Sequence, residues 1–138
     1  MSSFRFRREE KLKSRKVIEG LFKQDKRSSI GQYPLRLIWT PVLEKRGASP
    51  VLFTVSVPKR RYKTAVLRNR LRRQVREAWR LHKCQVYEAL PPDTTQYAWM
   101  VIYTGESPLA YSVIESAMRK MIRKFLTALP TRAGGENT

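Results

Sequence analysis

Apolar residues recur with the spacing of a strand in three segments of this chain. In residues 33–40 and 51–57 they occupy every second position, and residues 97–103 form a third, strongly apolar segment. A period of two is expected of a strand with one buried face. Residues 42–50, with their glycine and proline, predict the loop between the first two strands, and residues 28–31 could add a short edge strand. We therefore expect a β-sheet.

A helical period replaces this alternation in three other segments. A first helix is predicted to begin near Ser14, because apolar residues follow it at spacings i, i+3 and i+4. A second helix is predicted over residues 64–82. A last helix runs from residue 107 to about residue 129, with Ser107 as N-cap and Pro108 in the first helical position. The second helix carries one apolar stripe, made of Leu67, Leu71, Val75, Ala78 and Trp79.

The resulting order, α-β-β-α-β-α, predicts an α+β fold with one mixed β-sheet and helices packed on it. The 138 residues, 41% of them hydrophobic, suffice for one core. We expect a single domain over residues 9–130, a flexible basic N-terminus over residues 1–8 and a flexible tail over residues 131–138. Three tryptophans are assigned to the core: Trp39, Trp79 and Trp99.

The charge of the chain indicates which class of molecule it binds. Lys and Arg number 29 against 11 Asp and Glu, a net charge of +18. Residues 59–83 hold eleven basic side chains and one acid, whereas residues 84–106 hold no Lys or Arg and three acids. Such an imbalance favours a polyanionic partner, above all nucleic acid. The chain has no apolar run of membrane-spanning length and no hydrophobic signal core, so we expect no membrane and a cytoplasmic location.

The basic charge is concentrated on the second predicted helix. A solvated helix face usually interleaves Glu with Lys, but here Arg recurs at i, i+4, which destabilises an isolated helix. Arg also suits bidentate contact with phosphate. We therefore predict that this helix binds nucleic acid. Arg68 and Arg70 flank the apolar stripe, and the arc opposite it holds Asn69, Arg72, Arg73, Arg76 and Arg80.

The residue clusters that phosphodiester cleavage usually needs are missing from this sequence. Its acids are scattered, and no D-x-D, H-x-H or Gly-rich phosphate loop occurs. His82 has no acidic or basic partner at a motif spacing, and the one cysteine, Cys84, is assigned to an inert position at a helix end. We predict no catalytic residue, no metal ligand and no cofactor in this protein.

One segment carries a specific resemblance. Residues 53–76, FTVSVPKRRYKTAVLRNRLRRQVR, closely resemble the protein subunit of bacterial ribonuclease P. The matching features are a strand, a basic turn at Lys59 and Arg60, and a helix that opens with Arg68-Asn69-Arg70 and continues with further basic residues. The resemblance implies a left-handed β-α-β crossover. It also implies that the turn and the helix contact the catalytic RNA subunit, which holds Mg²⁺ and performs the cleavage.

The same resemblance implies a second surface, a cleft between the first helix and the sheet that takes the single-stranded 5′ leader of precursor tRNA. Phe22 falls at an aromatic, leader-contacting position of the family, although its helical spacing is equally that of a core residue. Ile18 would offer apolar contact one turn earlier. The sequence leaves open which strand face is concave. The candidates for the cleft floor are Arg36, Ile38, Thr54 and Ser56.

These features predict the protein component of ribonuclease P, a subunit of an endoribonuclease that matures the 5′ end of tRNA. Its expected partners are ribonuclease P RNA and precursor tRNA, with no obligate protein partner. Two alternatives are a ribosomal protein that binds rRNA structurally and a transcription factor with its basic helix in a DNA major groove. The chain shows neither helix-turn-helix pairing nor a dimerisation heptad, which disfavours the transcription factor.

Overall fold

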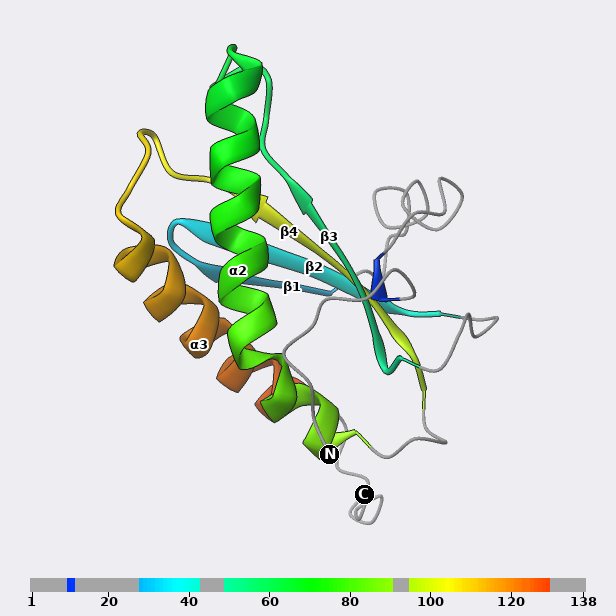
Figure 1. Ribbon diagram of the computed structural model, residues 1–138. Helices are drawn as coiled ribbons and strands as arrows, with labels where there is room; N and C mark the ends of the chain where they lie inside the picture. The colour runs from blue at the N-terminus through cyan, green and yellow to red at the C-terminus, as the bar shows by residue number, and fades with distance from the viewer. Residues whose placement is uncertain (1–9, 12–27, 43–48, 91–94, 130–138) are drawn as a thin grey trace.

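The computed structural model describes residues 10–11, 28–42, 49–90 and 95–129 (Figure 1). The predicted first helix, with Ile18 and Phe22, lies outside these residues, as do both predicted flexible ends. The described elements follow the predicted order of strands and helices. They are β1 (Ser28–Gln32), β2 (Leu35–Pro41), β3 (Val51–Ser56), α2 (Ala65–Ala89), β4 (Tyr97–Tyr103) and α3 (Tyr111–Ala128).

The four strands form one mixed sheet in the order β1-β2-β4-β3. β2 is antiparallel to both of its neighbours, whereas β3 and β4 are parallel and are joined by α2. In the upper half of Figure 1 both parallel strands run upward, β3 lies to the right of β4, and α2 lies on the viewer's side of the sheet. When two parallel strands point upward and the helix that joins them lies in front of the sheet, a second strand to the left of the first makes the crossover left-handed. Most β-α-β crossovers are right-handed. The predicted fold class is confirmed.

α2 and α3 cover one face of this sheet and enclose the main core. Trp79 of α2 stacks on Phe53 of β3 with ring centroids 4.9 Å apart, and it lies 4.7 Å from Trp99 of β4. Phe125 of α3 packs edge-on against Trp99 at 4.8 Å. Trp39, Trp79 and Trp99 are all buried, as predicted. This aromatic cluster holds both helices at fixed positions on the sheet.

The opposite face of the sheet changes character along its length. At one end Leu52, Ala98 and Met100 form a second buried apolar cluster together with Ile38. Toward the other end of β2 and β3 the residues on this face are more accessible, and Arg36 is exposed. The sheet therefore has one open, polar end on the side away from α2 and α3.

The second helix is longer than its basic run predicts. α2 continues to Ala89, seven residues beyond the predicted end at His82. The reason is that its last turns remain amphipathic, with Val86 buried on the core side and Leu90 buried at the C-cap. Cys84, expected at a helix end, consequently lies within the helix and is half-buried.

The last helix begins later than its proline signal predicts. α3 starts at Tyr111 with Ala110 as N-cap, so the assignment of Ser107 as N-cap is wrong. The hydroxyl of Tyr103 donates to the Ser107 carbonyl at 2.8 Å and accepts from the Leu109 amide at 3.0 Å. These contacts hold residues 107–109 in a loop against the sheet. No helix among the described residues is long and apolar enough to cross a membrane.

Candidate nucleic-acid interface

The basic turn that leads into α2 is fixed by interactions with its own backbone. The side chain of Thr64, the N-cap, accepts a hydrogen bond from the Leu67 amide at 3.4 Å. Arg68 donates from Nη1 to the carbonyls of Tyr62 and Lys63, each at 2.9 Å. Arg68, predicted to contact RNA, is half-buried and also shapes the turn.

Two further contacts anchor this turn to the strand end of the sheet. Tyr62 is buried and donates its hydroxyl to the Gly105 carbonyl at 2.6 Å, and burial raises the pKa of this phenol. A Cβ at Gly105 would stand 2.8 Å from the Tyr103 hydroxyl, so only glycine allows the loop to approach this closely. The turn therefore presents Lys59 and Arg60, both exposed, from a rigid base.

The predicted cationic arc lies on the outer side of α2. Asn69, Arg73 and Arg76 are exposed, and Arg70 beside them is exposed as well. Arg72 is half-buried and donates to the Asn69 side-chain oxygen at 2.9 Å. Among the described residues no carboxylate forms an ion pair with the three exposed arginines. Their charges are therefore available to a polyanion.

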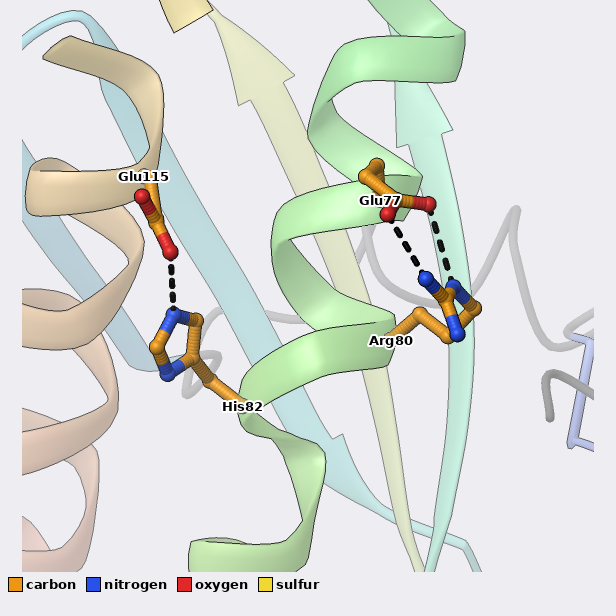
Figure 2. A network of polar contacts seen from close by, with 4 residues as sticks. All are labelled: Glu77, Arg80, His82 and Glu115. Atoms are coloured by element: carbon orange, nitrogen blue, oxygen red, sulfur yellow. Dashed lines mark hydrogen bonds and ion pairs between the residues drawn. The ribbon is translucent and has the colours of Figure 1, made fainter. Parts of the chain in front are cut away.

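Arg80 differs from the rest of this arc because it has a carboxylate partner. Its Nε and Nη2 donate to Glu77 at 3.0 and 2.7 Å in a bidentate pair on the surface of α2 (Figure 2). The hydrogen bond from Arg80 lowers the pKa of Glu77 below its ordinary value. Arg80 therefore adds less net charge to the arc than Arg73 or Arg76.

His82 has a partner that the sequence did not indicate. Its Nε2 lies 2.9 Å from Oε2 of Glu115, which is 33 residues away on α3. Figure 2 shows His82 pointing toward α3, whereas the Glu77–Arg80 pair lies on the other side of α2. The sequence prediction concerned partners at a motif spacing, and Glu115 lies outside any such spacing. The contact joins the two helices and lies away from the cationic arc.

Lys83 and Glu10 form a buried ion pair that sequence reasoning missed. Lys83 Nζ donates to the two Glu10 carboxylate oxygens at 2.8 and 2.6 Å, and the Tyr87 hydroxyl donates to the same carboxylate at 2.5 Å. Lys83 and Glu10 are both nearly inaccessible to solvent. The pKa of the Tyr87 phenol is strongly raised. Burial is the larger cause, and the adjacent Glu10 carboxylate is the second. The pair removes Lys83 from the cationic surface and fixes Glu10 against the last turns of α2.

The four predicted cleft-floor residues share one face of the sheet. In the register, Ile38 and Thr54 both stand opposite Met100, and Arg36 and Ser56 both stand opposite Ile102. All four therefore point to the sheet face away from α2 and α3. Ile38 is buried, Thr54 and Ser56 are half-buried, and Arg36 is exposed. The structure brings them together, while Ile18 and Phe22 lie outside the described residues.

The basic turn connects this sheet face to the cationic arc. It begins three residues after Ser56, the last residue of β3, and precedes α2. Arg61 in the turn donates to the Thr104 carbonyl at 3.4 Å, just beyond the end of β4. The arc, the turn and the open sheet end therefore form adjoining surfaces. Within the described part of the chain, no three His, Cys, Asp or Glu side chains gather as a metal ion would need.

These features define a class of protein: a small, basic α+β domain with an arginine-rich helix suited to a polyanion. The sequence profile of the Ribonuclease P family matches residues 6–127. The chain is also 33% identical over 134 residues to the Ribonuclease P protein component of Porphyromonas gingivalis strain ATCC 33277, covering 96% of this chain and 94% of that protein. The chain therefore belongs to the family of bacterial ribonuclease P proteins, as the resemblance of residues 53–76 predicted.

Solved structures with low sequence identity to this chain share its fold. The ribonuclease P protein of Staphylococcus aureus matches with a TM-score of 0.63 at 18% identity, over 84% of this chain and 94% of that one. The protein from Thermotoga maritima matches with a TM-score of 0.59 at 17% identity, over 88% and 99%. At this level of identity the similarity concerns the arrangement of strands and helices.

Proposed function

We propose that this chain binds the catalytic RNA subunit of ribonuclease P and the 5′ leader of precursor tRNA, and so promotes endonucleolytic maturation of the tRNA 5′ end. The observation that carries the proposal is that Arg70, Arg73 and Arg76 of α2 are exposed, with no ion pair to a described carboxylate, in a member of this family. The active site would lie in the RNA subunit, which would hold the Mg²⁺ ions. The protein would contribute charge and substrate contacts, and no cofactor of its own.

The RNA subunit would lie against the outer side of α2 and the basic turn. Arg73 and Arg76 would meet phosphates directly, because they are exposed and no described carboxylate pairs with them. Arg68 would act through the shape of the turn, and Arg80 would contribute less because Glu77 partly neutralises it. The full proposed surface is Lys59, Arg60, Arg68, Asn69, Arg70, Arg72, Arg73, Arg76 and Arg80.

The leader would lie on the open sheet face. The exposed Arg36 guanidinium would attract its phosphates, and the half-buried Thr54 and Ser56 would offer hydroxyls to bases or sugars. Ile38 would support this floor from below. Ile18 and Phe22 stay in the proposal as apolar and stacking contacts on the family resemblance alone.

The experiment is a salt titration of the affinity for the RNA subunit. The double variant Arg73→Ala/Arg76→Ala should bind more weakly and flatten the dependence of log K on log salt by about 1.4–1.8, because each lost phosphate contact removes about 0.7–0.9 from the slope. The matched control is Arg119→Ala/Arg123→Ala, which removes the same charge from exposed positions of α3. Equal flattening by both variants, or an unchanged slope in a normally folded α2 variant, would contradict the proposal.

A further inference from the structure

A second surface patch, with aromatic and cationic side chains, lies between the β1–β2 turn and α3. A hollow of about 270 Å³ separates them, and its lining includes Tyr33 from the turn and Val113, Ser116 and Lys120 from α3. None of these residues belongs to the α2 arc or to the open sheet face. We call this hollow and its rim the β1–α3 patch, defined by Tyr33, Val113, Lys120 and Lys124.

The β1–α3 patch exposes apolar surface in an unusual way. Three large hydrophobic side chains are exposed among the described residues, and two of them, Tyr33 at 60% and Val113 at 41%, line this one hollow. The Tyr33 hydroxyl accepts a hydrogen bond from the Glu106 amide at 3.3 Å, which fixes the position of the exposed ring. A fixed, accessible aromatic ring is the platform on which an unpaired base stacks.

The same patch carries two lysines, and the exposed Glu106 lies at its Tyr33 side. Lys120 lines the hollow, and Lys124 lies one helical turn further along α3. Neither lysine forms an ion pair in the described parts of the chain. Glu115, the acid of α3, is engaged with His82 of α2. Aromatic and cationic groups together suit single-stranded RNA better than a duplex, whose bases are not free to stack on protein.

The edge strand β1 links the patch to the open sheet face. Gly31 pairs with Arg36 in the register of β1 and β2, and its carbonyl accepts a hydrogen bond from Lys124 Nζ at 3.3 Å. Arg36 therefore lies on one side of the Gly31 backbone and Lys124 on the other. Gly31 has no side chain, and the Arg36 guanidinium lies beside it, 3.9 Å from where a Cβ would stand. The same guanidinium donates to the Ser29 hydroxyl on the same strand as Gly31 at 3.1 Å. Both cations therefore reach the edge strand β1 next to Gly31.

We propose that a long 5′ leader continues past the open sheet face, crosses β1 at Gly31 and ends in the β1–α3 patch. One base would stack on Tyr33, and neighbouring phosphates would contact Lys120 and Lys124. This inference rests on the proposed function, since it extends the leader path. It assigns to the protein a contact that only substrates with long leaders can make.

The experiment compares precursor tRNAs with progressively longer leaders, bound to the holoenzyme reconstituted from the full chain and the RNA subunit. Tyr33→Ala should weaken binding of the long-leader substrate about tenfold, the effect of one lost stacking contact, and leave the short-leader substrate unchanged. Tyr33→Phe keeps the ring and should retain most of the affinity. Lys120→Ala should lower the salt slope by about 0.7 for the long leader alone.

Arg119→Ala is the matched control, because Arg119 is an exposed cation of α3 that does not line the hollow. It should leave both substrates unchanged. Equal weakening of short-leader, long-leader and mature tRNA by the patch variants would show that the patch contacts another RNA segment, and would overturn the inference. If the patch variants change nothing while Arg36→Ala weakens every leader-bearing substrate, the inference alone fails. If Arg36→Ala also changes nothing, the proposed leader site itself fails.

Discussion

Arginine side chains of the same helix have different roles in this protein because their neighbours differ. Arg68 donates to two backbone carbonyls, Arg80 pairs with Glu77, and the exposed Arg73 forms no ion pair with any described acid. An Arg-rich sequence motif cannot distinguish these cases. Structure therefore divides the predicted RNA-binding set into residues that shape the turn and residues that are available to phosphate.

This division predicts different consequences for two substitutions. Arg68→Ala removes two charge-assisted hydrogen bonds to the turn, so it should lower the free energy of unfolding by about 1–3 kcal/mol and weaken RNA binding as the turn loosens. Arg73→Ala should weaken binding with no measurable loss of stability. Urea unfolding of both variants, run beside RNA affinity, measures each effect. A fully stable Arg68→Ala variant would refute the structural role.

At the scale of elements, α2 is held by contacts to each of its neighbours. Trp79 packs against the sheet, His82 contacts α3, and Lys83 binds Glu10 from the start of the chain. These three contacts lie within five consecutive residues of the helix. The exposed arc is consequently displayed on a helix with a fixed position and orientation.

The buried pair of Glu10 and Lys83 gives an element-scale prediction. Lys83→Met leaves the Glu10 carboxylate buried without its cation, so the free energy of unfolding should fall by about 3–5 kcal/mol. The double variant Lys83→Met/Glu10→Gln removes both charges and should recover much of this loss. Thermal and urea unfolding of the wild type, both single variants and the double variant give the coupling energy. Additive losses in this cycle would show that the pair is not coupled.

At the scale of the whole molecule, the net charge of +18 is the dominant property. Two RNA molecules brought together repel each other, and Mg²⁺ ordinarily screens this repulsion. A basic protein at their junction can replace part of that screening. The proposed contribution of the protein is therefore electrostatic and positional.

This property predicts how the protein changes the metal requirement of the reaction. Adding the protein to the RNA subunit should shift the Mg²⁺ concentration for half-maximal cleavage of precursor tRNA to a lower value. Protein freed rigorously of RNA should cleave nothing at any Mg²⁺ concentration. A Mg²⁺ titration of cleavage with and without the protein tests the first statement. Metal-dependent cleavage by the RNA-free protein would reject the second.

The sequence by itself determined the features that depend on neighbouring residues. Strand β4 was predicted over residues 97–103, where the structure has it, because its apolar run is a local signal. The apolar stripe of α2 and its opposite arginine arc follow from the helical period alone. The Arg68-Asn69-Arg70 motif and the basic turn before it were enough to indicate the family.

Only the tertiary structure decided the features that join distant residues. The contact of His82 with Glu115 spans 33 residues, and that of Lys83 with Glu10 spans 73. No spacing in the sequence encodes such pairs, because they arise when packed elements bring side chains together. The same holds for the sheet face shared by Arg36 and Thr54, which the strand register fixes, and for the patch where Tyr33 meets α3. Local periodicity determines the elements, whereas packing between them determines the surfaces that RNA would meet.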